Sequence, residues 1–231
     1  MSGFQFKQFY VAHQGAAMKV GTDGILLGSW AAISPNQRVL DIGTGSGLIS
    51  LMVKQREPSC MVTAIEVDGN AVMQARDNVA NSPWPDIDVN HTDVQSYHCS
   101  EPFDWLISNP PFFQQSLQGP NQARNTARHT DSLSFSDLFE AFLRLGNERA
   151  KMALILPAQS LEEIKQLAQH HQVYISRITY VKTTHTKAAK RVLFEITKTQ
   201  QVCLENEIVI HQGDGYHLDY INLCKDFYLK M

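Results

Sequence analysis

The stretch RVLDIGTGSG, residues 38–47, joins a short apolar run to three glycines spaced two residues apart. An apolar run of this length that stops at glycines is typical of a buried β-strand. Residues 46–56 then place apolar side chains at helical spacing. Glycine lets a backbone turn tightly and approach a ligand closely. The stretch therefore predicts a strand, a ligand-binding turn and a helix, which together begin an α/β fold.

The same alternation continues towards the carboxyl end of the chain. Further strands are expected over 61–67, 86–93, 103–112, 151–157, 173–181 and 191–199, and further helices over 70–81, 134–145 and 160–170. Such alternation predicts a parallel sheet with helices on both faces. The last two strands have no helix between them, so we expect a seven-stranded, mostly parallel sheet with an antiparallel edge strand.

We expect one domain across residues 1–231, with a Rossmann-like core over 38–199. Residues 1–37 form a leading segment, and 200–231 form a C-terminal extension that receives no assigned structure. The chain lacks an apolar signal segment and a run long enough to span a membrane. A cytoplasmic protein without membrane attachment is expected.

Charge and cysteine usage exclude some functions. The net charge of −3 gives no global basic field, so a nucleic acid would have to meet a local patch. Cys60, Cys99, Cys203 and Cys224 match neither zinc spacing nor CxxC, so reduced thiols and no metal are expected. Nothing in the sequence identifies a protein partner.

The glycine turn carries signs of its ligand. Gly43, Gly45 and Gly47 follow a Gly-x-Gly-x-Gly pattern rather than the Gly-x-Gly-x-x-Gly of dinucleotide sites. Asp41 precedes them, where a carboxylate would repel a pyrophosphate but suits a cationic ligand without phosphate. Glu66 ends the second strand, about where an acid takes ribose hydroxyls. A glycine-rich turn without a nucleotide, and an NAD-dependent oxidoreductase, remain alternatives.

This arrangement resembles the class I S-adenosylmethionine-dependent methyltransferases. The resemblance implies S-adenosylmethionine as cofactor and S-adenosylhomocysteine as product, with Asp41 near the methionine end, Glu66 on the ribose and Asp93 on the adenine. Asp93 has an alternative reading as a turn former. Further residues expected at the cofactor are Lys19, Thr22, Thr44, Val67, Val94 and Asn109.

The tetrapeptide Asn109-Pro110-Pro111-Phe112 follows an apolar strand at the edge where ligands bind in open α/β sheets. An amino group on an aromatic base must pyramidalise before it attacks a methyl group. Two acceptors on its hydrogens favour that change and stabilise the developing charge. The Asn109 side chain and the Pro110 carbonyl can be those acceptors, and Phe112 can stack on the base. The alternative is an ordinary strand end stopped by prolines.

The tetrapeptide is similar to the [NDS]PP[YFW] motif of amino methyltransferases, which act on adenine N6, cytosine N4, guanine N2 or glutamine amides. The motif alone leaves these acceptors open. A non-catalytic, cofactor-binding RNA protein is a further alternative.

Two groups of basic residues predict an RNA surface. One follows the tetrapeptide and the other covers 177–191, where no acid occurs between 176 and 194. An ordinary solvated face is the alternative for the second group. The expected RNA contacts are Pro111, Phe113, Arg124, Arg128, His129, Lys182, Lys187, Lys190 and Arg191, with Arg177 and His185 in the second group. We expect the acidic C-terminal stretch to lie away from the RNA.

The assembled pattern resembles the bacterial valine-tRNA adenine-N6 methyltransferase family over nearly the whole chain. The discriminating parts are residues 6–31, FKQFYVAHQGAAMKVGTDGILLGSWA, and residues 127–135, ARHTDSLSF, while AKRVLFE at 189–195 also fits. The resemblance implies an adenine of a valine tRNA anticodon loop splayed into the pocket. It also places Gly21 and Asp23 in a segment covering the cofactor, although Asp23 can instead cap a helix starting at Gly24.

Overall fold

The computed structural model describes residues 3–12, 20–111 and 133–231. Its strands are β1 (Gly3–Gln5), β2 (Tyr10–Ala12), β3 (Arg38–Ile42), β4 (Met61–Glu66), β5 (Asp88–His91), β6 (Phe103–Ser108), β7 (Gly146–Pro157), β8 (Tyr174–Lys182), β9 (Ala189–Thr197), β10 (Leu204–Val209), β11 (His211–Gln212) and β12 (Gly215–Tyr216). Its helices are α1 (Thr22–Trp30), α2 (Leu48–Arg56), α3 (Gly69–Ala80), α5 (Phe135–Leu145), α6 (Leu161–His170) and α7 (Leu218–Cys224), with a 3-10 turn at Ala158–Ser160.

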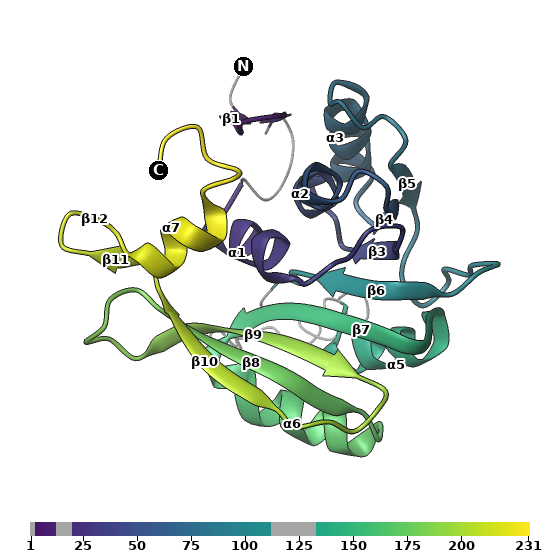
Figure 1. Ribbon diagram of the computed structural model, residues 1–231. Coiled ribbons are helices and arrows are strands. Elements are labelled where there is room, and N and C mark those ends of the chain that lie inside the picture. Colours follow the sequence, from purple (N-terminus) through teal and green to yellow (C-terminus); the bar gives the residue numbers. More distant parts are fainter. Residues whose placement is uncertain (1–2, 13–19, 112–132) are drawn as a thin grey trace, which may run out of the picture.

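The main sheet has the strand order β10-β8-β9-β7-β6-β3-β4-β5 (Figure 1). Strands β5, β4, β3, β6 and β7 pair in parallel, and β9 runs antiparallel to both β7 and β8. The mostly parallel α/β sheet is therefore confirmed, but two details of the expectation are wrong. The antiparallel strand lies inside the sheet, because β9 turns back and inserts beside β7. The sheet also has an eighth strand, since β10 from the C-terminal extension pairs with β8.

Helices cover both faces of the sheet. In Figure 1, α1, α2, α3 and α7 lie on one face, and α5 and α6 lie on the other. Side chains of a strand alternate between faces. Thus Val39 packs with the α1 layer, whereas Leu40 and Ile42 pack with α5 and α6. The same alternation in β6 sends Trp105 and Ile107 towards α1, and Asn109 continues that series.

The two ends of the chain lie together. The Phe6 and Phe9 rings stack with centroids 4.6 Å apart, and the Lys7 backbone N–H donates to the Phe227 carbonyl at 2.8 Å. Phe6 also forms an isolated bridge with Tyr228. Burial of these rings, worth about 1.5–3 kcal/mol for a side chain such as Phe, attaches the leading hairpin to α7 and its tail.

Local sequence fixes several helix ends. Ser134 caps α5 as expected, in a reciprocal capping box with Asp137, and such a cap is worth about 1 kcal/mol. Asp68 caps α3 by accepting from the Ala71 backbone N–H. Across the described residues, no helix combines the length and apolar character needed to cross a membrane.

Candidate active site

The turn between β3 and α2 depends on its glycines. Gly43, Gly45 and Gly47 have φ of 68°, 56° and 83°, in the left-handed region that favours glycine. A Cβ added at Gly43 or Gly45 would meet no atom of the described residues within 4 Å. Their requirement is therefore conformational, and this side of the turn is open to a ligand. The Gly43 backbone N–H anchors the turn by donating to the Ile65 carbonyl at 2.9 Å.

Asp41 is a buried carboxylate beneath this turn, with only 1% of its surface exposed. Its Oδ2 accepts from Thr44 Oγ1 at 2.6 Å, from Ser50 Oγ at 2.7 Å and from the Ser50 backbone N–H at 3.2 Å. Its Oδ1 is buried and finds no hydrogen-bond partner in the described part of the chain. A buried acceptor without a partner is costly, so Oδ1 is suited to a donor or cation on a ligand.

Burial raises the pKa of Asp41 from 3.8 to about 6, although the hydrogen bonds from Thr44 and Ser50 oppose the rise. The nearby charge of Glu66 adds to the rise. Desolvation thus outweighs three favourable hydrogen bonds, which fits a site adapted to receive positive charge.

We expect this pKa to be visible in the pH dependence of stability. Because folding raises the pKa, the folded chain holds the proton more tightly than the unfolded chain, and stability falls as the pH rises from about 4 to 6. The rise from 3.8 to about 6 corresponds to roughly 3 kcal/mol. Chemical denaturation of the wild type and of Asp41→Asn, which cannot titrate, should show free energies of unfolding that diverge by that order across this range. Parallel curves would show that Asp41 is not desolvated.

Glu66 links the glycine turn to the start of α3. Its Oε2 accepts from the Gly45 backbone N–H at 2.9 Å, and its Oε1 accepts from the N–H groups of Val67 at 2.9 Å and Asp68 at 3.1 Å. Beside it, Val67 is an exposed apolar residue, with 60% of its surface accessible. Asp41 is the last residue but one of β3, and Glu66 ends the neighbouring parallel strand β4, so both acids and the open glycines share one edge of the sheet.

Asp93, after β5, forms a turn in this structure. Its Oδ1 accepts from the Ser96 backbone N–H at 2.6 Å, and this hydrogen bond holds the pKa of Asp93 below its ordinary value. The Val94 side chain packs in the core beneath α5, with 3% of it exposed. The Val94 carbonyl accepts from Arg144 Nη2 at 2.6 Å, so its expected place at the cofactor stays a prediction.

The segment with the predicted catalytic role begins at Asn109, directly after β6 ends at Ser108. The Ser108 hydroxyl donates to the Ile42 carbonyl at 2.8 Å, which ties the end of β6 to the end of β3. Asn109 is half-buried, Pro110 is buried and Pro111 is exposed. Asn109 therefore lies at the same edge as Asp41 and Glu66.

Some predicted site residues fall outside the part of the chain that the structure describes. They are Lys19, Phe112, Phe113, Arg124, Arg128 and His129. Their assigned roles stay predictions.

Helix α1 lies beside Asn109, a neighbour that sequence reasoning missed. An ideal Cβ on Gly24 would lie 3.9 Å from Asn109 Nδ2 and 2.9 Å from Leu48 Cδ2. The helix begins at Thr22, which is exposed, and its N-cap Gly21 offers no side-chain hydrogen bond. The alternative role of Asp23 as helix cap is therefore wrong, because Asp23 lies inside the first turn and accepts from Arg191 Nε at 2.8 Å.

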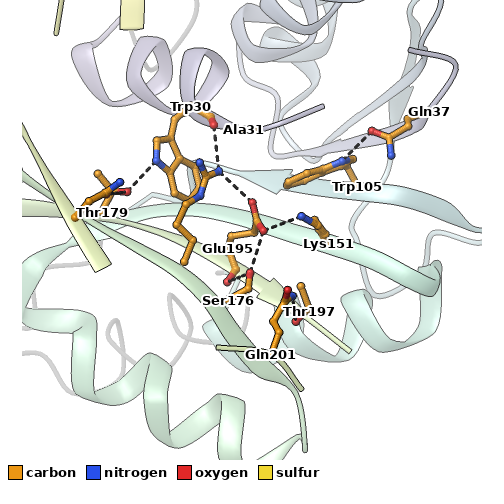
Figure 2. A network of polar contacts seen from close by, with 12 residues as sticks. Trp30, Ala31, Gln37, Trp105, Lys151, Ser176, Thr179, Glu195, Thr197 and Gln201 are labelled. Carbon is orange, nitrogen blue, oxygen red and sulfur yellow. Dashed lines mark hydrogen bonds and ion pairs between the residues drawn. The ribbon is translucent and has the colours of Figure 1, made fainter. Parts of the chain in front are cut away.

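The far end of α1 is fixed by a polar cluster on the sheet. Figure 2 shows Trp30 reaching from α1 towards Thr179, and Glu195 bonded to Lys151 and Ser176. Trp30 Nε1 donates to Thr179 Oγ1 at 2.9 Å, and the Arg177 guanidinium lies 3.6 Å from the Trp30 ring centroid. Buried Glu195 pairs with Arg177 at 3.0 Å and with Lys151 at 2.9 Å. Nothing in the sequence near Glu195 indicates this cluster.

The basic group over 177–191 is not a continuous field of unpaired cations. Arg177 pairs with Glu195, Lys182 pairs with Glu207, and Arg191 pairs with Asp23. The absence of acids between 176 and 194 misleads here, because the carboxylates arrive from β9, β10 and α1. The acidic C-terminal stretch thus borders this surface through β10 instead of lying apart from it. Lys187 and His185 are exposed on the β8–β9 connection, and Lys190 is exposed at the start of β9.

No cluster of three or more potential metal ligands occurs among residues 3–12, 20–111 and 133–231. The polar groups at the sheet edge are instead two separate carboxylates, the backbone of the glycine turn and the Asn109 amide. This set suits an organic ligand with positive charge and hydroxyl groups.

The architecture and this edge define a class I methyltransferase fold. A solved structure, a predicted O-methyltransferase from Agrobacterium tumefaciens, superimposes with a TM-score of 0.68 over 89% of this chain and 96% of that one, at 21% identity. The model of the family "Methyltransferase small domain" matches residues 19–131.

Two relatives show which methyltransferase family the chain belongs to. The tRNA1(Val) (adenine(37)-N6)-methyltransferase of Pseudoalteromonas translucida is 48% identical over the whole of both chains. The protein of the same name from Aeromonas hydrophila is 45% identical over 100% of this chain and 98% of the relative. The chain belongs to the tRNA1(Val) (adenine(37)-N6)-methyltransferase family.

Proposed function

We propose that the chain transfers a methyl group from S-adenosylmethionine to the exocyclic N6 of an adenine in the anticodon loop of valine tRNA. The observation that carries this proposal is the shared position of Asp41, Glu66 and Asn109 at one sheet edge, around glycines that leave open space. Full-length similarity to relatives named for adenine 37 of tRNA1(Val) supports the substrate.

The residues present fit the cofactor. The unpartnered Oδ1 of Asp41 and its neighbour Glu66 supply negative charge where a sulfonium amino acid needs it. Asp41 would hold the methionine end, Glu66 the ribose hydroxyls and Asp93 the adenine amino group, while Val67 offers an exposed apolar surface to the adenine ring. When bound, S-adenosylmethionine supplies an electrophilic methyl group.

Asn109 and Pro110 would act on the adenine amino group. The Asn109 side-chain oxygen accepts one N6 hydrogen and the Pro110 carbonyl accepts the other, which draws the nitrogen lone pair out of conjugation. Proline fixes φ and brings no competing N–H donor. The positively charged amino group that forms is acidic, so the proton leaves to solvent without a dedicated base. Phe112 would stack on the base.

On the proposed RNA surface, cations that already pair with carboxylates are less suited to bind phosphate than the exposed ones. Arg177, Lys182 and Arg191 would have to give up carboxylate partners to bind phosphate. Lys187 on the β8–β9 connection and Lys190 at the start of β9 keep their proposed role as phosphate contacts, each neutralising charge in a salt-dependent manner.

The acceptor class can be tested by incubating the purified chain and labelled cofactor with total RNA and, separately, with total protein. We expect label in the tRNA fraction of the RNA pool, because the site accommodates a planar amino group and the relatives share the whole chain. Label confined to the protein pool would point to a glutamine amide, and label in ribosomal RNA would point to guanine N2. Either outcome would replace the proposed substrate.

A further inference from the structure

The first turn of α1 is attached to the main sheet by an ion pair. Asp23 Oδ2 accepts from Arg191 Nε at 2.8 Å, and the two residues are 168 positions apart in sequence. Arg191 lies in β9, in register with Pro157 at the end of β7. The side chains of Asp23 and Arg191 are 25% and 33% exposed, so solvent only partly screens their interaction.

This turn contacts both halves of the candidate active site. An ideal Cβ on Gly24, the residue after Asp23, would be 2.9 Å from the Leu48 side chain and 3.9 Å from Asn109 Nδ2. Leu48 opens α2 directly after Gly47 of the cofactor turn. A shift of this turn would therefore move the packing of the glycine turn and of Asn109 together.

Local sequence does little to hold the turn in place. Gly21 is the N-cap and makes no side-chain cap, although a capping side chain is the usual way to fix a helix start. The Trp30 cluster holds only the opposite end of α1 (Figure 2). At the end of α1 near Asn109, the ion pair between Asp23 and Arg191 connects the helix to the main sheet.

We propose that Asp23 and Arg191 are positioning residues, which hold the first turn of α1 against Leu48 and Asn109 so that cofactor and amino group meet in line. This inference rests on the proposed function and deepens it. It also gives Arg191 a different task from the phosphate contact that its place in a basic segment predicts. Small misplacements of reacting groups can cost up to about 100-fold in rate, so a modest ion pair can control a large kinetic effect.

The test compares Asp23→Asn, Arg191→Gln, the double variant and the charge exchange Asp23→Arg with Arg191→Asp. We expect each single change to lower kcat about tenfold with little change in the KM for tRNA, and the double variant to be no worse than either single one. The charge exchange should recover part of the lost rate. The exposed pair Glu162 and Lys165 on α6, 3.1 Å apart, provides a matched control, and neutralising it should leave kcat unchanged.

A phosphate role for Arg191 predicts the opposite pattern. Arg191→Gln would then raise the KM for tRNA and flatten its salt dependence, while Asp23→Asn, which removes a negative charge, would leave tRNA binding unchanged or tighter. That result would overturn the proposal, and so would additive effects of the two changes.

Amide hydrogen exchange of the ligand-free chain separates this inference from the proposed function. Loss of the ion pair should speed exchange in the first turn of α1 for both Asp23→Asn and Arg191→Gln, and not for the Glu162 and Lys165 variants. If the wild type methylates no tRNA but shows this exchange pattern, the proposed function fails and the attachment of α1 stands. Unchanged exchange in both variants would overturn the attachment whatever the activity.

Discussion

Replacing Asn109 with alanine is expected to lower the rate of methyl transfer by about 100-fold or more while S-adenosylmethionine still binds. Removing one preorganised group that stabilises a developing charge typically lowers the rate by about 100- to 1,000-fold. Asn109 follows β6 on the face that carries α1, and its amide nitrogen lies near Gly24. Alanine removes the acceptor for the amino hydrogen without altering Asp41, Glu66 or the glycine turn.

Single-turnover kinetics and cofactor calorimetry measure the two effects separately. Asn147→Ala is a suitable control, because Asn147 Nδ2 also makes a side-chain hydrogen bond, to Asp104 at 2.7 Å, but lies at the start of β7, at the opposite edge of the sheet. We expect that variant to keep its transfer rate. Equal activity of Asn109→Ala and the wild type would remove Asn109 from the reaction.

The second large effect is expected at Glu66. Glu66→Ala should weaken cofactor binding by roughly 100-fold, because hydrogen bonds to a charged group are worth about 1.5–3 kcal/mol each and a carboxylate can accept from both ribose hydroxyls. The loss has a second source in the structure. Three backbone N–H groups, from Gly45, Val67 and Asp68, converge on this carboxylate, so its removal also loosens the turn.

Glu66→Gln distinguishes the two sources, since it keeps the shape and one acceptor oxygen but loses the charge. We expect an intermediate loss of affinity in calorimetry. The melting temperature should fall less than in Glu66→Ala, because the glutamine oxygen still accepts on one side while its NH2 faces a backbone N–H group on the other. Glu163→Gln, an exposed change on α6, should alter neither quantity. Wild-type affinity in Glu66→Gln would exclude the assigned contact with the ribose.

Much of the fold could be predicted because its signals are local. Gly43, Gly45 and Gly47 all adopt positive φ, a demand that few other residues meet, and so their spacing is visible in sequence. The core strands can also be predicted, because a strand that is buried along most of its length, such as β3, is a mostly apolar run in the sequence. Strand β10 gives no such signal. As an edge strand it exposes its side chains from Leu204 to Glu207, and its polar residues resemble a loop.

The surface was harder to predict because charges pair across large sequence distances. Lys182 and Glu207 are 25 positions apart, and Arg191 and Asp23 are 168 apart. Counting acids near a basic segment cannot detect such partners. The approach of α1 to Asn109 is hidden for the same reason, because it depends on how a helix near the amino end packs against the end of β6. Only the topology brings them together.

The central claim is the identity of the methylated atom, and mass spectrometry of nucleosides tests it most directly. Unmodified valine tRNA is incubated with the purified chain and S-adenosylmethionine, digested and compared with a transcript carrying guanosine at position 37, the position named in the relatives. We expect N6-methyladenosine in the first transcript and none in the second. Methyl groups on guanosine or cytidine, or N6-methyladenosine that persists when adenine 37 is replaced, would contradict it.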